Sequence, residues 1–175
     1  SEVAAGAIAW GEPVLESAIS TVRDGQFIVR GKVIEALATK SSLEGVACLL
    51  WNADQVPPQG VMRRTAGSTP KARAFAMLAR RANDDAPSLG RNPAALRADA
   101  WSILHEFSVA LSGQDAGLIH QRLARAWKLD AQGANIVRRA LVLMADHELN
   151  ASTFAVRIAA STGAPPAACA LAGLS

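Results

Sequence analysis

The chain of 175 residues contains no tyrosine and only eight other aromatic residues, four Trp and four Phe. Half of its residues are nevertheless hydrophobic, so most of its apolar surface comes from alanine and aliphatic side chains. Alanine is the best helix former, and this composition favours close-packed helices over a β-sandwich. The scarcity of aromatic residues therefore predicts a mainly α-helical protein, and the length suffices for one domain with its own core.

Cysteine is also scarce, since only Cys48 and Cys169 are present, in apolar runs far apart in the sequence. This arrangement predicts two buried thiols and gives no support for a disulfide or a metal site. No uninterrupted apolar run approaches the roughly 18 residues of a membrane-spanning helix, and the start does not resemble a signal peptide. We therefore expect no membrane partner, no bound metal and a cytoplasmic location.

The net charge of +3 is mild, so it allows the binding of anionic small molecules but does not require nucleic acid. The most basic part of the chain lies between Arg63 and Arg81. Its cationic residues are Arg63, Arg64, Lys71, Arg73, Arg80 and Arg81. Such a run is usually a solvated helix face. The alternative is a helical interaction module that binds an acidic partner or nucleic acid through this region.

Residues 19–30 carry the signal of a β-hairpin. Two β-prone runs, 19–23 and 26–30, flank Asp24-Gly25, which is typical of a two-residue hairpin turn. A two-stranded element of this size is marginal by itself, so it must pack against helices. We expect a small N-terminal hairpin on an otherwise helical domain.

Helix periodicity and start signals predict the remaining elements. The expected helices cover residues 33–38, 42–51, 70–83, 93–111, 118–127, 130–144, 151–161 and 167–174. The predicted N-caps are Ser42, Asn92, Asp130 and Asn150, and Pro70 and Pro93 lie in first helical turns.

Two histidines lie within these predicted helices. His105 is expected, together with Glu106, at the surface or at a helix interface. His120 is interpreted as structural, because no metal-ligand partner occurs at i+3 or i+4.

A polar stretch at 145–153 joins the two predicted helices 130–144 and 151–161. Ile136, Ala140, Leu143 and His147 fall on one helical stripe, so the stripe and His147 are expected to face the core. Asn150 caps the following helix, whose N-terminus suits an anion. A His, an Asn amide and the Ser152 hydroxyl close together fit a small carboxylate. Plain capping explains the same residue types, so both interpretations stay open at this point.

The sequence Ala-Asp-His-Glu-Leu-Asn-Ala-Ser-Thr-Phe at 145–154 resembles the large-domain signature of the citrate synthase family, which includes 2-methylcitrate synthases. The flanking residues 138–144 and 159–164 are similar to the same family. Near the N-terminus Arg30-Gly31 also matches, but Lys32-Val33 departs from the family pattern, so Lys32 is given no role. The resemblance covers nearly the whole chain and about the first half of a complete synthase.

This resemblance implies a multi-helical citrate synthase-like large domain over 1–175, with the small domain absent, and a homodimer. In the family the matching His and Asn contact oxaloacetate, so His147 and Asn150 are expected to bind substrate. Ser152 is expected near the acetyl-CoA end as an auxiliary group. Which residues contact coenzyme A stays open, although one or two arginines of the 63–81 region are an alternative to the solvated face.

The resemblance further implies that the catalytic residues follow Ser175, where the family has a Gly-Pro-x-His-Gly-Gly motif. Asp146 and Glu148 flank His147 in sequence and point to other helix faces, so neither is expected to be the catalytic base. The complete protein is expected to condense acetyl-CoA or propionyl-CoA with oxaloacetate, without a permanently bound cofactor. A second polypeptide could then carry the C-terminal half, and a non-catalytic binding or regulatory relative is the alternative.

Overall fold

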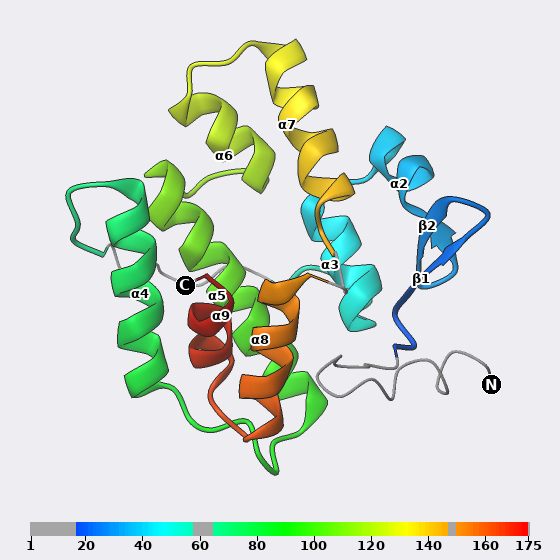
Figure 1. Ribbon diagram of the computed structural model, residues 1–175. Coiled ribbons are helices and arrows are strands. Elements are labelled where there is room, and N and C mark those ends of the chain that lie inside the picture. The colour runs from blue at the N-terminus through cyan, green and yellow to red at the C-terminus, as the bar shows by residue number, and fades with distance from the viewer. Residues whose placement is uncertain (1–16, 58–64, 147–149, 175) are drawn as a thin grey trace.

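The computed structural model describes residues 17–57, 65–146 and 150–174. Within these ranges a small antiparallel sheet precedes eight helices (Figure 1). The mainly α-helical class with an N-terminal hairpin, predicted from the sequence, is thus confirmed. Among the described helices, none combines the length and the apolar character that a membrane crossing requires.

The sheet consists of β1 (Ser20–Arg23), β2 (Gln26–Val29) and β3 (Lys32–Val33), paired antiparallel in that order. Arg23 pairs with Gln26, so Asp24 and Gly25 form the whole connection between β1 and β2. Both have positive φ, 51° and 74°, as a type I′ hairpin turn requires. The predicted hairpin is therefore present, and the short strand β3 extends it.

A first hydrophobic cluster holds the sheet against the helices α2 (Ile34–Lys40), α3 (Leu43–Trp51) and α7 (Ala131–Leu143). Its buried members are Val29, Ile34, Leu37, Ala38, Val46 and Val142. Val29 and Val142 are completely buried, although more than a hundred residues separate them in the sequence. The cluster therefore attaches the N-terminal sheet to the helix that precedes the polar joint.

A second cluster joins α4 (Pro70–Asp84), α5 (Pro93–Ser112) and α9 (Pro166–Leu174). Met77 and Leu78 of α4 are each 1% exposed, as is Ala74, so these three residues form the apolar stripe of this helix. Full burial of a side chain such as Leu78 stabilises a fold by about 1.5–3 kcal/mol. In addition, α9 packs against both α4 and α8 (Ala151–Ser161).

The remaining helix, α6 (Ile119–Ala126), pairs with α7, and the two form a helical hairpin at the top of Figure 1. The first turns of most helices are closed by a side chain that accepts the N–H three residues later. The residues that do so are Ser42, Thr69, Asn92, Asp130 and Asn150. The four predicted N-caps are thus confirmed, and each such cap contributes about 1 kcal/mol.

The predicted core-facing stripe of α7 is wrong at Ile136 and Ala140, whereas Leu143 of the same stripe packs against the first cluster. Ile136 is 60% exposed and Ala140 is exposed, whereas Val142 is completely buried. The helical period was correct, but its phase is set by packing against α2 and α3, which the local sequence does not encode. At the C-terminal end of α6, Trp127 is 57% exposed, whereas Leu123 is 7% exposed.

Candidate functional site

The joint between α7 and α8 begins at the hydrophobic core. Helix α7 ends at Leu143 with Met144 as its C-cap, and Ala145 packs against the first cluster. Asp146 is half-buried. The predicted substrate residue His147 lies outside the described residues, together with Glu148 and Leu149. The structure therefore describes only the two ends of the joint, which are Asp146 and Asn150.

Asn150 forms the far end of the joint as the N-cap of α8. Its extended backbone, with φ −90° and ψ 158°, lets Oδ1 accept a hydrogen bond from the Thr153 N–H at 2.8 Å. Within the part of the chain that the structure describes, the N–H groups of Ala151 and Ser152 are then the open donors of the first turn. These donors and the positive end of the helix dipole make the N-terminus of α8 suitable for a carboxylate.

Ser152 lies on the exposed part of this first turn and also lines a cavity of about 570 Å³. The walls are mainly apolar and come from α3, α4, α5, α8 and α9, with Ile103, Leu104 and Phe107 among them. Ser152 and Thr153 supply hydroxyl groups at its α8 wall. A cavity of this size with few polar groups is typical of small-ligand sites.

Gly173 allows α9 to approach the start of α8 closely beside this cavity. A Cβ atom at position 173 would lie 2.5 Å from Cγ2 of Val156 and 3.2 Å from the Ser152 carbonyl oxygen. Both distances are shorter than van der Waals contact, so the helices can pack this way only with glycine at the position. Gly173 therefore helps to place the first turn of α8.

Arg138 holds α7 in place, a role that the sequence analysis missed. Its guanidinium donates hydrogen bonds to the carbonyl oxygens of Thr39, at 3.2 Å, and of Ser41. These carbonyls lie at the C-terminal end of α2, where a cation is favourable. No local signal could have revealed the contact, because it spans about a hundred residues of sequence.

A separate buried polar cluster joins α3, α5 and α6. Oε1 of Glu44, a residue that is 6% exposed, accepts the N–H of Ile119 at 2.6 Å, at the start of α6. Arg122 donates to Nδ1 of His105 at 2.7 Å and to Oγ of Ser108 at 2.8 Å. Because Nδ1 accepts this bond, His105 is neutral with its proton on Nε2. The cluster fastens helices to one another and is distant in sequence from the joint.

Both histidines of this region lie at helix interfaces, as predicted for His105 and as the structural interpretation of His120 requires. Burial lowers the pKa of His105, and the charge of Arg122 lowers it further. Burial is also the main cause that lowers the pKa of His120. Among the described residues, Nδ1 of His120 has no hydrogen-bond partner. Both side chains are thus neutral at pH 7.

The two cysteines differ in burial. Cys169 is 6% exposed, as predicted, whereas Cys48 is only half-buried, and both are free thiols. Burial raises the pKa of each thiol, with a further contribution from Glu44 at Cys48. Within the described ranges no group of three or more His, Cys, Asp or Glu residues could hold a metal ion.

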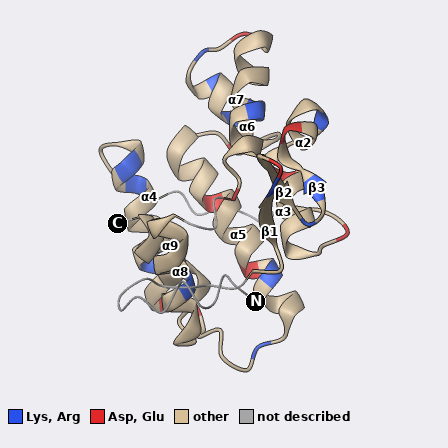
Figure 2. Cartoon of the chain, turned by 45° about the vertical axis from the view of Figure 1, so that its right-hand side comes forward, with Lys and Arg blue, Asp and Glu red and all other residues tan. Residues whose placement is uncertain are grey.

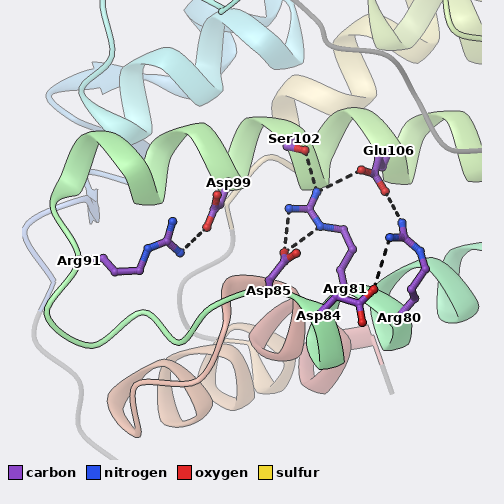
Figure 3. A network of polar contacts seen from close by, with 8 residues as sticks. All are labelled: Arg80, Arg81, Asp84, Asp85, Arg91, Asp99, Ser102 and Glu106. Atoms are coloured by element: carbon purple, nitrogen blue, oxygen red, sulfur yellow. Dashed lines mark hydrogen bonds and ion pairs between the residues drawn. The ribbon is translucent and has the colours of Figure 1, made fainter.

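The basic region is not the solvated face that its composition indicated. Nη2 of Arg80 lies 2.9 Å from Oε2 of Glu106 on α5 (Figure 3). Arg81, which is 7% exposed, contacts Asp85, Ser102 and Glu106 in the same network. Glu106 is thereby located at a helix interface, in agreement with the prediction.

Arg73 also contributes to packing, since its Nε donates to the carbonyl oxygen of Ala110 at 2.8 Å. Arg63 and Arg64 lie outside the described residues. In Figure 2 the Lys and Arg positions are spread over several elements, including α4 and α7, and do not gather on one face. The described part of the basic region therefore offers little free charge for an acidic partner.

Fold and joint together define a helical protein with a carboxylate-compatible helix N-terminus between α7 and α8. Residues 55–175, more than half of the chain and the whole joint, match the family model described as citrate synthase, C-terminal domain. The chain belongs to the citrate synthase family.

Among solved structures, the chain is similar to the citrate synthase from Thermotoga maritima MSB8. The sequences are 19% identical, the TM-score is 0.60, and the match covers 94% of this chain and 53% of that chain. This likeness shows the shared fold. The chain spans about half the length of the structure that it matches.

Proposed function

We propose that this chain supplies the keto-acid binding part of a citrate synthase-type acyltransferase. The complete enzyme condenses acetyl-CoA or propionyl-CoA with oxaloacetate, and both are substrates rather than bound cofactors. The observation that supports this most is that the family match includes the joint, where Asn150 caps α8 beside its open N–H donors. Oxaloacetate is a dicarboxylate, which suits this positive helix end.

Within the proposal the predicted site residues divide between the two substrates. His147 and Asn150 bind oxaloacetate, and Ser152 is an auxiliary group at the acyl-CoA end. The apolar cavity beside Ser152 supports this division, because it could take an uncharged group next to the polar joint.

The chemical step needs more than this chain contains. A base must remove a proton from the carbon next to the thioester carbonyl, and an acid must stabilise the enol that forms. The enol carbon then attacks the ketone carbon of oxaloacetate, whose oxygen takes up a proton to become a hydroxyl, and a water molecule hydrolyses the thioester and releases coenzyme A. We assign no residue of this chain as base or acid, so we expect the chain alone to be inactive.

The test of the binding role is calorimetric titration of oxaloacetate into the chain and its variants. His147→Ala and Asn150→Ser are expected to weaken binding by at least about tenfold, the equivalent of one lost charge-assisted hydrogen bond. Serine retains the helix cap while removing the amide. Gln132→Ala, at an exposed position of α7, is the control and is expected to bind normally. Wild-type affinity in both joint variants contradicts the proposed role.

Whether a second polypeptide is present is tested by the intact mass of the purified sample. A single species near 18.2 kDa without release of coenzyme A supports the expectation that this chain is inactive alone. Release of coenzyme A by that single species contradicts it. A second species that restores release supports a two-chain enzyme.

We further propose that the protein forms a homodimer through the outer faces of α7 and α8. Ile136, Met144 and Ile158 are 60%, 71% and 51% exposed, and no residue of α8 is buried. Exposed apolar side chains of this size are typical of an interface, and these three lie on elements that follow one another along the chain.

A further inference from the structure

The N-terminal sheet has one face toward the core and one away from it. Val29 on β2 is completely buried in the first cluster, and Phe27 packs against the same cluster. Residues at alternate positions of a strand lie on the opposite face, and cross-strand partners share a face. The pairs Thr21–Ile28 and Arg23–Gln26 therefore lie on the outer face of the β1–β2 hairpin.

A cavity of about 490 Å³ opens beside this outer face. Among the described residues, the charged members of its lining are Arg23 and Arg30, and Ser17 and Thr21 supply hydroxyl groups. Asp24, in the hairpin turn, is not part of the lining. The described lining of this concave cavity is therefore positively charged, with no carboxylate among its described residues.

Arg30 lies with Gly31 in the two-residue turn between β2 and β3, since Val29 pairs with Lys32. Its φ is +47° and Gly31 follows with φ +76°, as a type I′ hairpin turn requires. The Arg30 N–H donates to the carbonyl oxygen of Ile19 at 2.7 Å, which closes the base of the hairpin. The turn accounts for this backbone conformation, and the Arg30 side chain lines the cavity.

Donor groups remain available in the cavity. Nη2 of Arg30 donates to the carbonyl oxygen of Leu50 at 3.1 Å, which leaves most of the guanidinium donors without a bond to another described residue. Among the described residues, Arg23 has no ion pair. Oγ of Ser17 accepts the Ile19 N–H at 3.0 Å, so its own hydrogen can still be donated.

We propose that this cavity binds the phosphate groups of a small anionic ligand, held by Arg23 and Arg30 with the hydroxyls of Ser17 and Thr21. Guanidinium groups match phosphate oxygens in geometry as well as charge. Two cationic side chains lining one cavity favour a diphosphate over a single carboxylate. The site is separate from the α7–α8 joint and does not depend on the keto-acid proposal.

The probe is inorganic pyrophosphate, titrated calorimetrically into the whole chain at low ionic strength. We expect saturable binding that weakens as salt is added, because exposed charges are screened. Arg23→Gln and Arg30→Gln are each expected to weaken binding by at least about tenfold, since each removes charged hydrogen bonds to phosphate. Arg139→Gln, at an exposed position of α7, is the control and should bind as the wild type does.

Folding of each variant is checked by far-UV circular dichroism, and Arg23→Lys separates charge from geometry. Lysine keeps the charge without the guanidinium fork, so the affinity of Arg23→Lys for pyrophosphate is expected to lie between those of wild type and Arg23→Gln.

A parallel titration with adenosine diphosphate distinguishes the source of the phosphates. Tighter binding than pyrophosphate indicates a nucleotide, and equal binding indicates recognition of the diphosphate alone.

Two outcomes overturn the proposal. One is the absence of saturable pyrophosphate binding up to about 10 mM, well above the millimolar affinity that a weak specific site retains. The other is an equal loss of affinity in Arg139→Gln and Arg23→Gln, which would mean that only net charge attracts the anion.

Discussion

Replacement of Glu44 by alanine tests how α6 is attached to the body of the protein. Helix α6 has no side-chain N-cap of its own, and its first N–H is bonded instead by Oε1 of Glu44 at 2.6 Å. Glu44 is 75 residues away in sequence and is 6% exposed. The carboxylate therefore acts as the cap of a helix to which it does not belong.

The expected loss of unfolding free energy follows from the hydrogen bond between Glu44 and the Ile119 N–H. A hydrogen bond from a buried N–H to a charged group contributes about 1.5–3 kcal/mol, and alanine would leave the Ile119 N–H buried without a partner. Against this, Oε2 of Glu44 is itself unpaired among the described residues, so removal of the charge relieves part of its desolvation cost. We expect Glu44→Ala to lower the free energy of unfolding by about 2 kcal/mol.

Glutamine at the same position separates the hydrogen bond from the charge. It keeps an acceptor oxygen and removes the unpaired charge, so Glu44→Gln is expected to cost less than about 1 kcal/mol. Glu35→Ala is the matched control, because Glu35 also lies in a first helical turn but is exposed. Its effect should stay within about 0.5 kcal/mol.

The measurement is urea unfolding followed by circular dichroism, with equal m-values required for comparison. If Glu44→Ala is no worse than Glu35→Ala, the remote cap contributes nothing. If Glu44→Gln is as damaging as Glu44→Ala, the charge matters and the hydrogen bond does not. Either result would refute the reasoning.

Because burial lowers the pKa of His105 and His120, the unfolded chain binds more protons than the folded chain below about pH 6.5. The urea midpoint should therefore fall from about pH 7 to about pH 5.5, and an unchanged midpoint contradicts their burial as neutral groups. Gly173→Ala should destabilise by about 1–3 kcal/mol in urea unfolding, because its Cβ would overlap Val156. Gly45→Ala, with 3.9 Å of space, should instead stabilise by about 0.5–1 kcal/mol. Ile158→Lys should shift sedimentation toward the monomer, and an unchanged distribution excludes Ile158 from a dimer interface.

The sequence predicted the local features of the fold well. Each predicted N-cap, such as Asn92, needs only its own helix to form, and the Asp24-Gly25 turn needs only two strands. The β-strand β3 was missed because two residues carry no periodic signal.

Contacts between distant segments could not be predicted in the same way. Arg81 belongs to a run that composition describes as solvated, but its partner Glu106 lies on another helix. Ile136 was expected inside because it shares a helical period with Leu143, yet the neighbours of α7 select a different face. Periodicity gives the spacing of an apolar stripe, and tertiary packing chooses which stripe is buried.

The candidate site also combines features that local sequence predicts with contacts between distant segments that it does not. Its motif residues were recognisable from the sequence, and the family match covers them within residues 55–175. The helix that leads to them, however, is held by Arg138 on the carbonyls of Thr39 and Ser41, and by Val142 in a cluster with Val29. These partners lie before residue 55. The N-terminal sheet and α2 therefore set the position of α7, and through it the start of the joint where the keto acid is proposed to bind.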